Sequence, residues 1–218
     1  GGVDLSGVTT IGVVNKVDAS GSTGNVKVNL STQANSVAYT GSEGVDTYTA
    51  SKAGDTIYTG KGADVVTLDA KAAAAGAVRD TFVLKAATDS QITDTSKDGK
   101  ITLGGDTGFD EVINFDSIGD VTPVANTSDR LDLTNFGFTG SQRGVSDVSA
   151  SVTNATDLTS IVDLFSTPAG DRGVAYTKIG SDSFVFVDAN KDGNFTAADD
   201  LVIKLTGVGA VSETFINF

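Results

Sequence analysis

Residues 41–67 place carboxylates at a spacing that suits a metal ion. The stretch can be written as three nonapeptides, each with an Asp at the same place and an apolar residue two positions later. The glycines before the Asp allow positive φ, so a tight turn can form with its carbonyl oxygens facing inward. Carboxylate and carbonyl oxygens are the ligands that calcium prefers. The predicted ligands are Asp46, Asp55 and Asp64, and the apolar partners are Tyr48, Ile57 and Val66.

The nine-residue period predicts how these turns stack. Two nonapeptides complete one coil, so residues eighteen apart should lie on the same side, about 4.8 Å apart along the coil axis. We therefore expect a calcium ion between the turns of Asp46 and Asp64. Asp55 falls on the other side, where its stacking positions are Val37 and Ala73, so an ion there would be incomplete. The alternative is an ordinary β-hairpin with Gly and Asp in its turns.

A second group of acidic residues lies between residues 94 and 113. Residues 105–113 match the nonapeptide once more, and residues 94–99 resemble the start of a calcium loop whose twelfth position is Gly105. We expect calcium here; the alternative is a solvated turn. The predicted ligands are Asp94, Asp98, Asp106 and Asp110.

The sharpest motif is residues 188–199, which match the EF-hand loop D-x-N-x-D-G. Gly193 stands at position 6, where that loop turns sharply, and Phe195 supplies the apolar position 8. Both flanks read as strands rather than helices, so we expect an EF-like loop in a hairpin. The alternative is an acidic hairpin loop without metal. The predicted ligands are Asp188, Asn190, Asp192, Asn194, Thr196 and Asp199.

The composition supports oxygen chemistry. The 218 residues include no Cys, His, Met or Trp, which removes disulfides, thiolate ligands and imidazole ligands or bases. Net charge is -13, and of the 28 acidic residues 25 are Asp, the short carboxylate typical of turns and metal loops. The negative charge argues against nucleic acid or an anionic membrane as a partner. We find no nucleophile elbow, P-loop or HExxH motif, and we expect no enzymatic activity.

The elements that position these motifs are short strands. Val, Thr, Gly and Asp are abundant, and apolar residues alternate between polar turns, which predicts an all-β fold. Residues 157–165 carry the single convincing amphipathic helix, and residues 70–77 suggest a helical turn. No apolar run is long enough for a transmembrane helix, and we expect no membrane insertion. The start Gly1-Gly2, without Met or a signal peptide, indicates a fragment of a larger protein.

The nonapeptides of residues 41–67 resemble the RTX family repeat G-G-x-G-x-D-x-U-x, in which U is apolar. From about residue 81 onward the chain also resembles the C-terminal region of type I-secreted RTX proteins, including serralysin-type metalloproteases and Gram-negative S-layer proteins. The stretches that carry this second resemblance are residues 108–115, 129–133 and 184–188.

The resemblance implies a fold and an export route. We expect β-strands leading into an RTX-type parallel β-roll in residues 1–70. A β-sandwich-like C-terminal portion with one short helix and a secretion tail should follow in residues 71–218. The family's ligands fall on Asp46, Asp64 and Asp55. The chain should leave the cell unfolded through the type I secretion machinery, guided by an uncleaved C-terminal signal, and fold on extracellular calcium.

Three roles remain open for such a module. The first is an assembly domain of a cell-surface S-layer protein, which would self-associate into a lattice. The second is the C-terminal cap of an RTX adhesin, and the third is the same cap on a secreted hydrolase. The acidic composition, rich in Thr, Val, Ala and Gly, favours the first. Each of the three implies a secreted, extracellular location.

Overall fold

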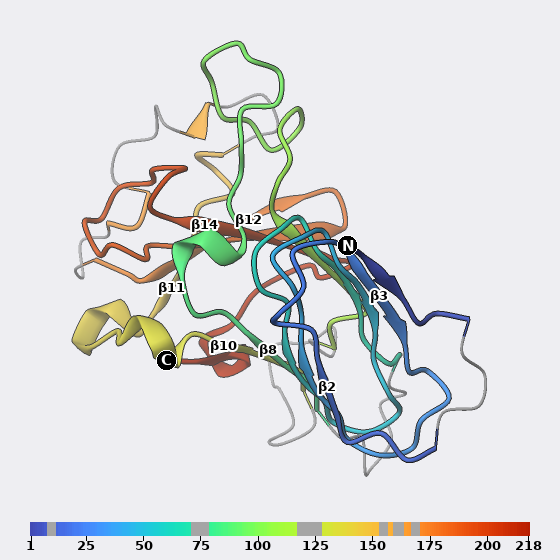
Figure 1. Ribbon diagram of the computed structural model, residues 1–218. Helices are drawn as coiled ribbons and strands as arrows, with labels where there is room; N and C mark the ends of the chain where they lie inside the picture. Colours follow the sequence, from blue (N-terminus) through green and yellow to red (C-terminus); the bar gives the residue numbers. More distant parts are fainter. Residues whose placement is uncertain (8–11, 71–78, 117–127, 153–156, 159–163, 167–170) are drawn as a thin grey trace.

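The fold is known from a computed structural model, which describes residues 1–7, 12–70, 79–116, 128–152, 157–158, 164–166 and 171–218 (Figure 1). Short strands dominate these residues. The strands of the N-terminal half are β1 (Val3–Asp4), β2 (Lys16–Asp18), β3 (Val26–Asn29), β4 (Ala38–Thr40), β5 (Thr47–Thr49), β6 (Thr56–Tyr58), β7 (Val65–Thr67) and β8 (Thr81–Val83). Those that follow are β9 (Asp110–Ile113), β10 (Arg130–Asp132), β11 (Val145–Asp147), β12 (Val174–Ile179), β13 (Asp182–Val187), β14 (Leu201–Thr206) and β15 (Ile216–Asn217).

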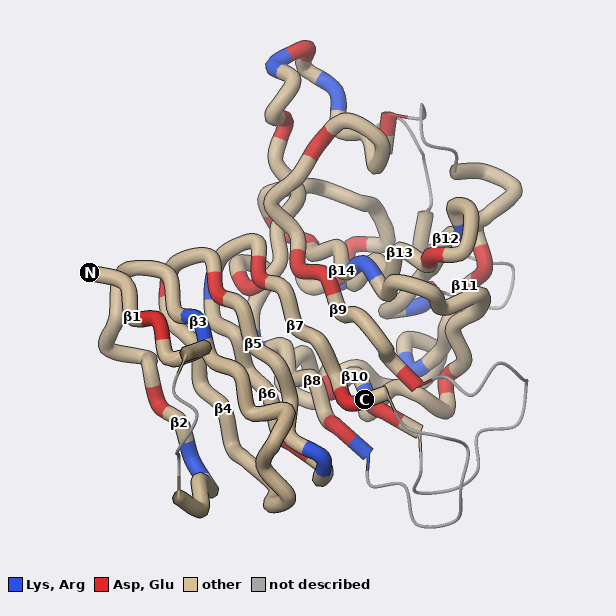
Figure 2. Tube along the Cα trace, turned by 90° about the vertical axis from the view of Figure 1, so that its right-hand side faces the viewer, with Lys and Arg blue, Asp and Glu red and all other residues tan. Residues whose placement is uncertain are grey.

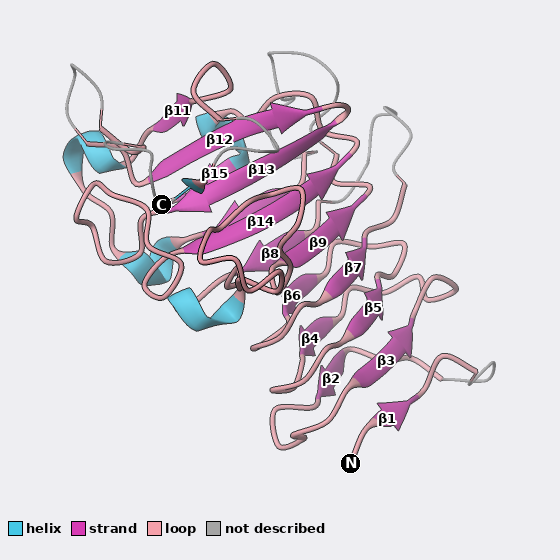
Figure 3. Cartoon of the chain, turned by 90° about the horizontal axis from the view of Figure 1, so that it is seen from above, coloured by secondary structure: helices cyan, strands magenta, loops and turns pink. Residues whose placement is uncertain are grey.

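From β1 to β10, successive strands alternate between two sheets and pair in parallel, so the chain coils as a roll (Figure 3). One sheet begins β1-β3-β5-β7-β9, and the other has the order β15-β10-β8-β6-β4-β2. Thr47 of β5 lies opposite Val65 of β7, and Ala38 of β4 lies opposite Thr56 of β6. Both pairs are eighteen residues apart, as two nonapeptides per coil require. The predicted all-β fold with a parallel β-roll is confirmed.

The eighteen-residue period is lost after residue 67. Thr56 of β6 lies opposite Thr81 of β8, and Val65 of β7 lies opposite Glu111 of β9. The prediction that position 73 stacks on Asp55 is therefore wrong. What recurs is a shorter pattern, an Asp two residues before a buried apolar side chain, and the number of residues between these triplets varies. The triplets beyond the nonapeptides begin at Asp80, Asp110 and Asp129.

The C-terminal strands continue the roll's sheet. β14 pairs in parallel with β9, and β13 and β12 follow it as antiparallel neighbours, with β11 outermost. β15 pairs with β10 at the edge of the other sheet. The division at residue 70 stays a prediction, but both sheets run across it, and β12–β14 extend the nine-stranded sheet instead of forming a separate sandwich.

The predicted helix over 157–165 and the turn over 70–77 lie largely outside the described residues. The helical pieces that are described are single 3₁₀ turns: η1 (Ala87–Asp89), η2 (Thr134–Phe136), η3 (Gly140–Gln142) and η5 (Glu213–Phe215). In the part of the chain that the structure describes, no helix is long and apolar enough to cross a bilayer.

Two apolar clusters hold the elements together. Inside the roll, the residue two positions after each triplet Asp is fully buried, as the period-2 alternation of a strand requires. Beside it, a second cluster under β12–β14 includes Phe165, Phe184, Phe186 and Phe195. The roll residues that fill this role are Tyr48, Ile57, Val66, Phe82, Val112 and Leu131.

The close stacking of the turns gives a first prediction. Gly60 has φ +91, and a Cβ there would lie 2.1 Å from the carbonyl oxygen of Ser42 on the preceding coil. We expect Gly60→Ala to lower the free energy of unfolding by at least about 2 kcal/mol, because left-handed strain adds to a backbone clash. Gly207 (φ +81) has open space around it, so Gly207→Ala should show the strain alone. Urea unfolding of both variants measures the difference, and equal losses would contradict the stacking.

Candidate metal centre

A column of buried aspartates runs along one side of the roll. The Oδ1 atom of Asp46 accepts the N–H of Val26 at 2.8 Å. The N–H of Asp46 donates to Asp64 Oδ1 at 2.7 Å, and the N–H of Asp64 donates to Asp110 Oδ1 at 2.9 Å. Each carboxylate thus binds the backbone of the preceding coil. In Figure 2 acidic residues recur at the same edge of successive coils, from the N-terminus to β9. The predicted stacking of Asp64 beneath Asp46 is found.

A second column occupies the other side. Val37 donates its N–H to Asp55 Oδ1 at 2.8 Å, Asp55 donates to Asp80 Oδ1 at 2.7 Å, and Asp80 donates to Asp129 Oδ1 at 2.7 Å. Asp80 and Asp129 are absent from the sequence prediction because they are out of the nine-residue register. The triplet Asp-x-apolar, present at both places, is the signal that finds them.

Asp64 and Asp110 are the poorly compensated members of the first column. They are 1% and 0% exposed, and Asp64 Oδ2 has no hydrogen-bond partner. Thr59 donates its hydroxyl to Asp110 Oδ2 at a long 3.3 Å. Among the described residues, the ion pairs of Lys16, Lys61 and Lys204 all go to other carboxylates. Two buried carboxylates side by side without a cation are costly to ionise.

The electrostatics of this pair follow from its burial. Burial raises the pKa of Asp64 to about 7; the N–H of Asp46 opposes this rise, and the Asp46 carboxylate adds to it. Burial, followed by the charge of Asp64, raises the pKa of Asp110 well above its usual range. An ion that supplies positive charge between these groups would reverse both shifts.

The surroundings of Asp64 and Asp110 fit an oxygen-seeking cation. Besides the two carboxylates and the Thr59 hydroxyl, the stacked turns bring backbone carbonyls close: a Cβ on Gly62 would lie 2.5 Å from the carbonyl oxygen of Gly44. Within the described ranges no three acidic side chains converge on one point. Carbonyl, hydroxyl or water oxygens would therefore complete a coordination shell of the kind calcium accepts, with its 6–8 oxygens.

The loops at 94–106 and 188–200 share one hydrogen-bond pattern. Asp94 accepts the N–H groups four and five residues ahead at 3.3 and 2.8 Å, and Asp188 does the same at 3.1 and 3.0 Å. Lys97 and Lys191 both have positive φ (58 and 64), as do Gly99 and Gly193 (80 and 83). The two loops therefore have the same backbone conformation, although the sequence matches the EF-hand loop only in part at residue 94 and closely at residue 188.

An aspartate twelve residues after the first closes each loop. Asp106 accepts the N–H of Thr95 at 2.9 Å and of Thr102 at 2.8 Å. Asp200 accepts the equivalent N–H groups, those of Ala189 and Thr196, at 2.9 and 2.8 Å. The sequence prediction includes Asp106 but not Asp200. The sequence signal that could have identified Asp200 is its spacing from the first Asp of the loop, which equals the spacing of Asp106 from Asp94.

The remaining predicted ligands of the 188–199 loop lie at its surface. Asp192 accepts from Asn194 N at 2.8 Å and from Asn190 Nδ2 at 3.0 Å. Asp199 is exposed and accepts the Thr196 hydroxyl at 3.3 Å. Whether any of these side chains binds a metal stays a prediction.

The two ends of the 188–200 loop are electrostatically coupled. Burial raises the pKa of Asp188. Burial also raises the pKa of Asp200 to about 6, with backbone N–H groups opposing the rise and the Asp188 carboxylate adding to it. A cation in this loop would offset that repulsion.

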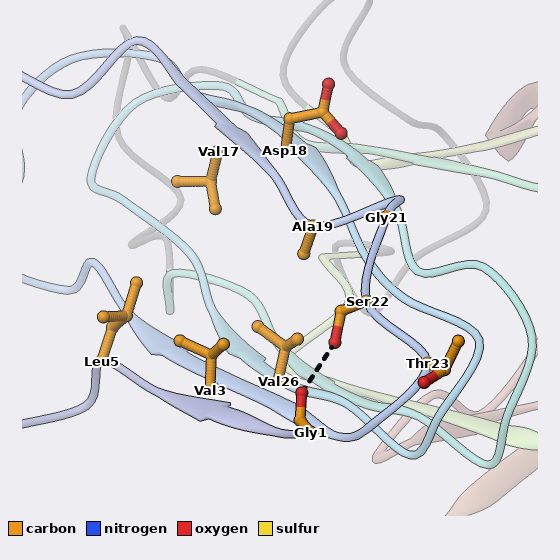
Figure 4. A pocket seen from close by; sticks show the side chains of 10 residues that line it. All are labelled: Gly1, Val3, Leu5, Val17, Asp18, Ala19, Gly21, Ser22, Thr23 and Val26. Carbon is orange, nitrogen blue, oxygen red and sulfur yellow. Dashed lines mark hydrogen bonds between the residues drawn. The ribbon is translucent and has the colours of Figure 1, made fainter.

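The hollow at the open end of the roll shows no comparable chemistry (Figure 4). Its volume is about 400 Å³, and it lies between β1 and β2. Apolar side chains line most of it, Asp18 is its one charged residue, and Ser22 Oγ donates to the Gly1 carbonyl at 3.2 Å. It has no converging set of polar groups of the kind that orients a small molecule.

The raised pKa values predict how metal-free protein responds to pH. Asp64 has a pKa of about 7 when folded and about 3.9 in an unfolded chain. Between these values the folded state keeps a proton that the unfolded state has released. Its contribution is full below about pH 4 and is lost as pH rises through 7. We expect the free energy of unfolding to fall by about 1.4 kcal/mol per pH unit for one such group.

Urea unfolding in metal-free buffer at pH 5, 6 and 7 measures this slope. The same series on Asp64→Asn, which cannot titrate at that position, is the control and should be flatter. Stability that rises over this interval in the original chain would contradict the assignment.

Comparison with known proteins gives the following. No family model matches the chain, and no curated protein matches it. Solved structures with some likeness include the solution structure of the AlgE6R2 subunit from the Azotobacter vinelandii mannuronan C5-epimerase. It is 18% identical, with 94% of this chain and 91% of that chain covered, at a TM-score of 0.45. Because the likeness is this low, the assignment of a β-roll rests on the strand order and register described above.

Proposed function

We propose that this chain is a calcium-binding structural module whose β-roll is stabilised by calcium. The observation that carries the proposal is the buried pair Asp64 and Asp110, of which Asp64 Oδ2 has no partner. An ion that binds the folded state alone stabilises it by RT ln(1 + [L]/Kd), about 2.7 kcal/mol at a hundredfold excess over Kd. Extracellular calcium modules typically have a Kd of about 10⁻⁴–10⁻³ M. Such a site would fill outside the cell.

The proposed ligands fall into three groups. Asp46, Asp55, Asp64 and Asp110 belong to the roll, with Thr59 and turn carbonyls beside the last two. Asp94, Asp98 and Asp106 belong to one EF-like loop. The other loop contributes Asp188, Asn190, Asp192, Asn194, Thr196 and Asp199, and its closing residue Asp200 joins the set. Calcium would neutralise part of the net charge of -13 and remove the repulsion between these carboxylates.

We further propose that the parent is a secreted bacterial surface protein, and that the module acts structurally in S-layer assembly instead of catalysing a reaction. The acidic, Thr- and Val-rich composition without Cys supports this role. β1 and β2 each have one neighbour among the described strands, so their outer edges offer backbone groups to another copy. The second candidate is the calcium cap of an RTX adhesin or secreted hydrolase, which would not self-assemble.

Export through a type I machinery is part of the same proposal. Phe115 and Phe215 contact each other at 6.2 Å between ring centroids, and Ile216 pairs with Leu131. The C-terminal residues are therefore part of the folded sheets. A secretion signal there would be accessible only in the unfolded chain, which agrees with folding after export.

Titration of calcium into chelator-treated protein tests the proposal, with far-UV circular dichroism and light scattering followed together. We expect β signal to increase at sub-millimolar to millimolar calcium. Scattering that increases with it, and sheets in the electron microscope, would support S-layer assembly; folding without assembly would favour a cap. Chelated protein that is fully folded and unchanged by calcium would overturn the calcium-dependent module itself.

A further inference from the structure

The three nonapeptide turns differ in the hydrogen bonds that they donate to their aspartates. Asp46 accepts four hydrogen bonds, one of them from the backbone of the preceding coil (Val26). The other three come from its own turn: Ser42 donates its N–H and its hydroxyl, both at 2.7 Å, and Tyr39 donates its hydroxyl at 3.2 Å. Both oxygens of this carboxylate are therefore bound by groups of the protein.

The turn of Asp55 repeats this arrangement. Ser51 donates its N–H at 2.8 Å and its hydroxyl at 2.7 Å, Tyr48 donates its hydroxyl at 2.8 Å, and Val37 donates its N–H at 2.8 Å. Burial raises the pKa of both tyrosines, and a nearby negative charge adds to the rise: that of Asp46 for Tyr39 and that of Asp55 for Tyr48. Both phenols thus remain protonated donors. Their rings stack at 4.2 Å inside the roll.

The turn of Asp64 lacks both donors. Seven residues before this Asp stands Ile57, where the other turns have Tyr, and four residues before it stands Gly60, where they have Ser. Gly60 has φ +91, whereas neither Ser42 nor Ser51 is among the described residues with positive φ. The backbone of this turn therefore takes a different course, and Asp64 Oδ2 is left without a partner.

From this contrast we infer that the residues seven and four positions before each Asp decide whether its turn needs a cation. Tyr and Ser at these positions supply internal donors that take the place of an ion at Asp46 and Asp55. Ile57 and Gly60 leave that place open at Asp64, so the nonapeptide region binds one divalent oxygen-seeking cation, between Asp64 and Asp110. This inference rests on the proposed function and narrows the ligand set predicted for the roll.

The inference divides the roll into two parts. The coils through β6 keep their carboxylates satisfied without metal, so they should remain folded when calcium is removed. The junction between β7 and β9 depends on the ion, because the buried carboxylates of Asp64 and Asp110 repel each other when both are ionised. The backbone of this junction is bonded at the same place: the N–H of Asp64 donates to Asp110, and the N–H of Glu111 donates to the Asp64 carbonyl at 2.8 Å. Since β14 is attached through β9, loss of calcium should loosen the connection of the C-terminal strands.

Hydrogen exchange read by mass spectrometry on the whole 218-residue chain tests this division without a mutation. We expect chelation to increase exchange at least tenfold in peptides that cover 62–67 and 110–113. Peptides that cover 37–40 and 47–51 should change by less than about threefold, an amount we set as the limit for unaffected structure. Exchange that increases equally in both sets would overturn the inference.

Calorimetric counting of bound calcium gives a second test with matched variants. Asp64→Asn should bind one calcium fewer per chain than the original protein, and Asp55→Asn should bind the same number. A loss of one calcium in Asp55→Asn would overturn the inference while the calcium-binding module stands. An original chain that binds no calcium would instead overturn the proposed function. If Asp55→Asn does not fold, the hydrogen-exchange comparison on the original chain, which needs no mutation, decides in its place.

Discussion

Replacing Asp55 by Ala is expected to lower the free energy of unfolding by more than about 3 kcal/mol, with or without calcium. The substitution leaves the N–H groups of Val37 and Ser51 and the hydroxyls of Ser51 and Tyr48 without their acceptor. A buried donor without a partner costs about 1–3 kcal/mol. Because these donors connect two coils, the loss should appear as a lower midpoint of urea unfolding.

Asp18→Ala is the matched control for this prediction. Asp18 also accepts an N–H and a hydroxyl, both from Ser20, but at the exposed end of β2. Water replaces the carboxylate there, so a change within about 0.5 kcal/mol is expected. If the two variants lose similar stability, the buried acceptor is not what holds the coils together.

Replacing Phe195 by Ala is expected to lower the free energy of unfolding by about 3–5 kcal/mol. Phe195 is buried, and its ring meets that of Phe186 edge-on at 5.7 Å. It stands in the middle of the 188–200 loop, so its loss should also release the loop from β13 and β14. We expect lower thermal stability together with weaker calcium binding, both measurable by calorimetry.

Val13→Ala, at a side chain that is 75% exposed, is the control and should change neither quantity. A Phe195→Ala variant that keeps its stability would show that the loop does not depend on the second apolar cluster. One that loses stability but binds calcium as before would show that the loop does not contribute to binding.

The sequence predicts the roll well where its repeats are regular. Between Ala38 and Thr67 the apolar positions and the Asp positions both follow the period of nine, and the observed register follows it too. Beyond Thr67 a fixed period of nine no longer predicts the register, because more than nine residues separate the successive triplets that begin at Asp64, Asp80 and Asp110. The physical unit is the coil, which needs an Asp acceptor and a buried apolar side chain but sets no limit on the loop between coils.

Two of the residues missed by sequence reasoning share this cause. Asp80 and Asp129 occupy the same structural position as Asp55, yet they fall outside any fixed spacing from it. Asp200 is missed for a different reason. The EF-hand pattern ends at position 12, whereas the antiparallel flanks β13 and β14 place the inward carboxylate one residue later. In both cases the tertiary pairing, and not the local motif, selects the buried Asp.

The difference between Asp55 and Asp64 also needed the structure. Both have an Asp and an apolar partner in register, but Gly60 and Gly62 stand at glycine positions of the repeat where the turn of Asp55 has Ser51 and Ala53. What this contrast means for the two carboxylates becomes clear only once the donor atoms are placed. A tyrosine at the apolar position is conspicuous in Tyr39 and Tyr48, but its hydroxyl could equally have faced solvent at the end of the roll.

Calorimetric melting of metal-free protein at pH 8, with and without 10 mM calcium (about tenfold or more above the Kd expected of an extracellular module), tests the central claim most directly. We predict that calcium raises the Tm of the original chain by several degrees or more, and that Asp64→Asn shows a clearly smaller rise. An equal rise in both would place the ion elsewhere than at Asp64 and Asp110. A Tm of the original chain that calcium leaves unchanged would contradict the account of a roll stabilised by calcium.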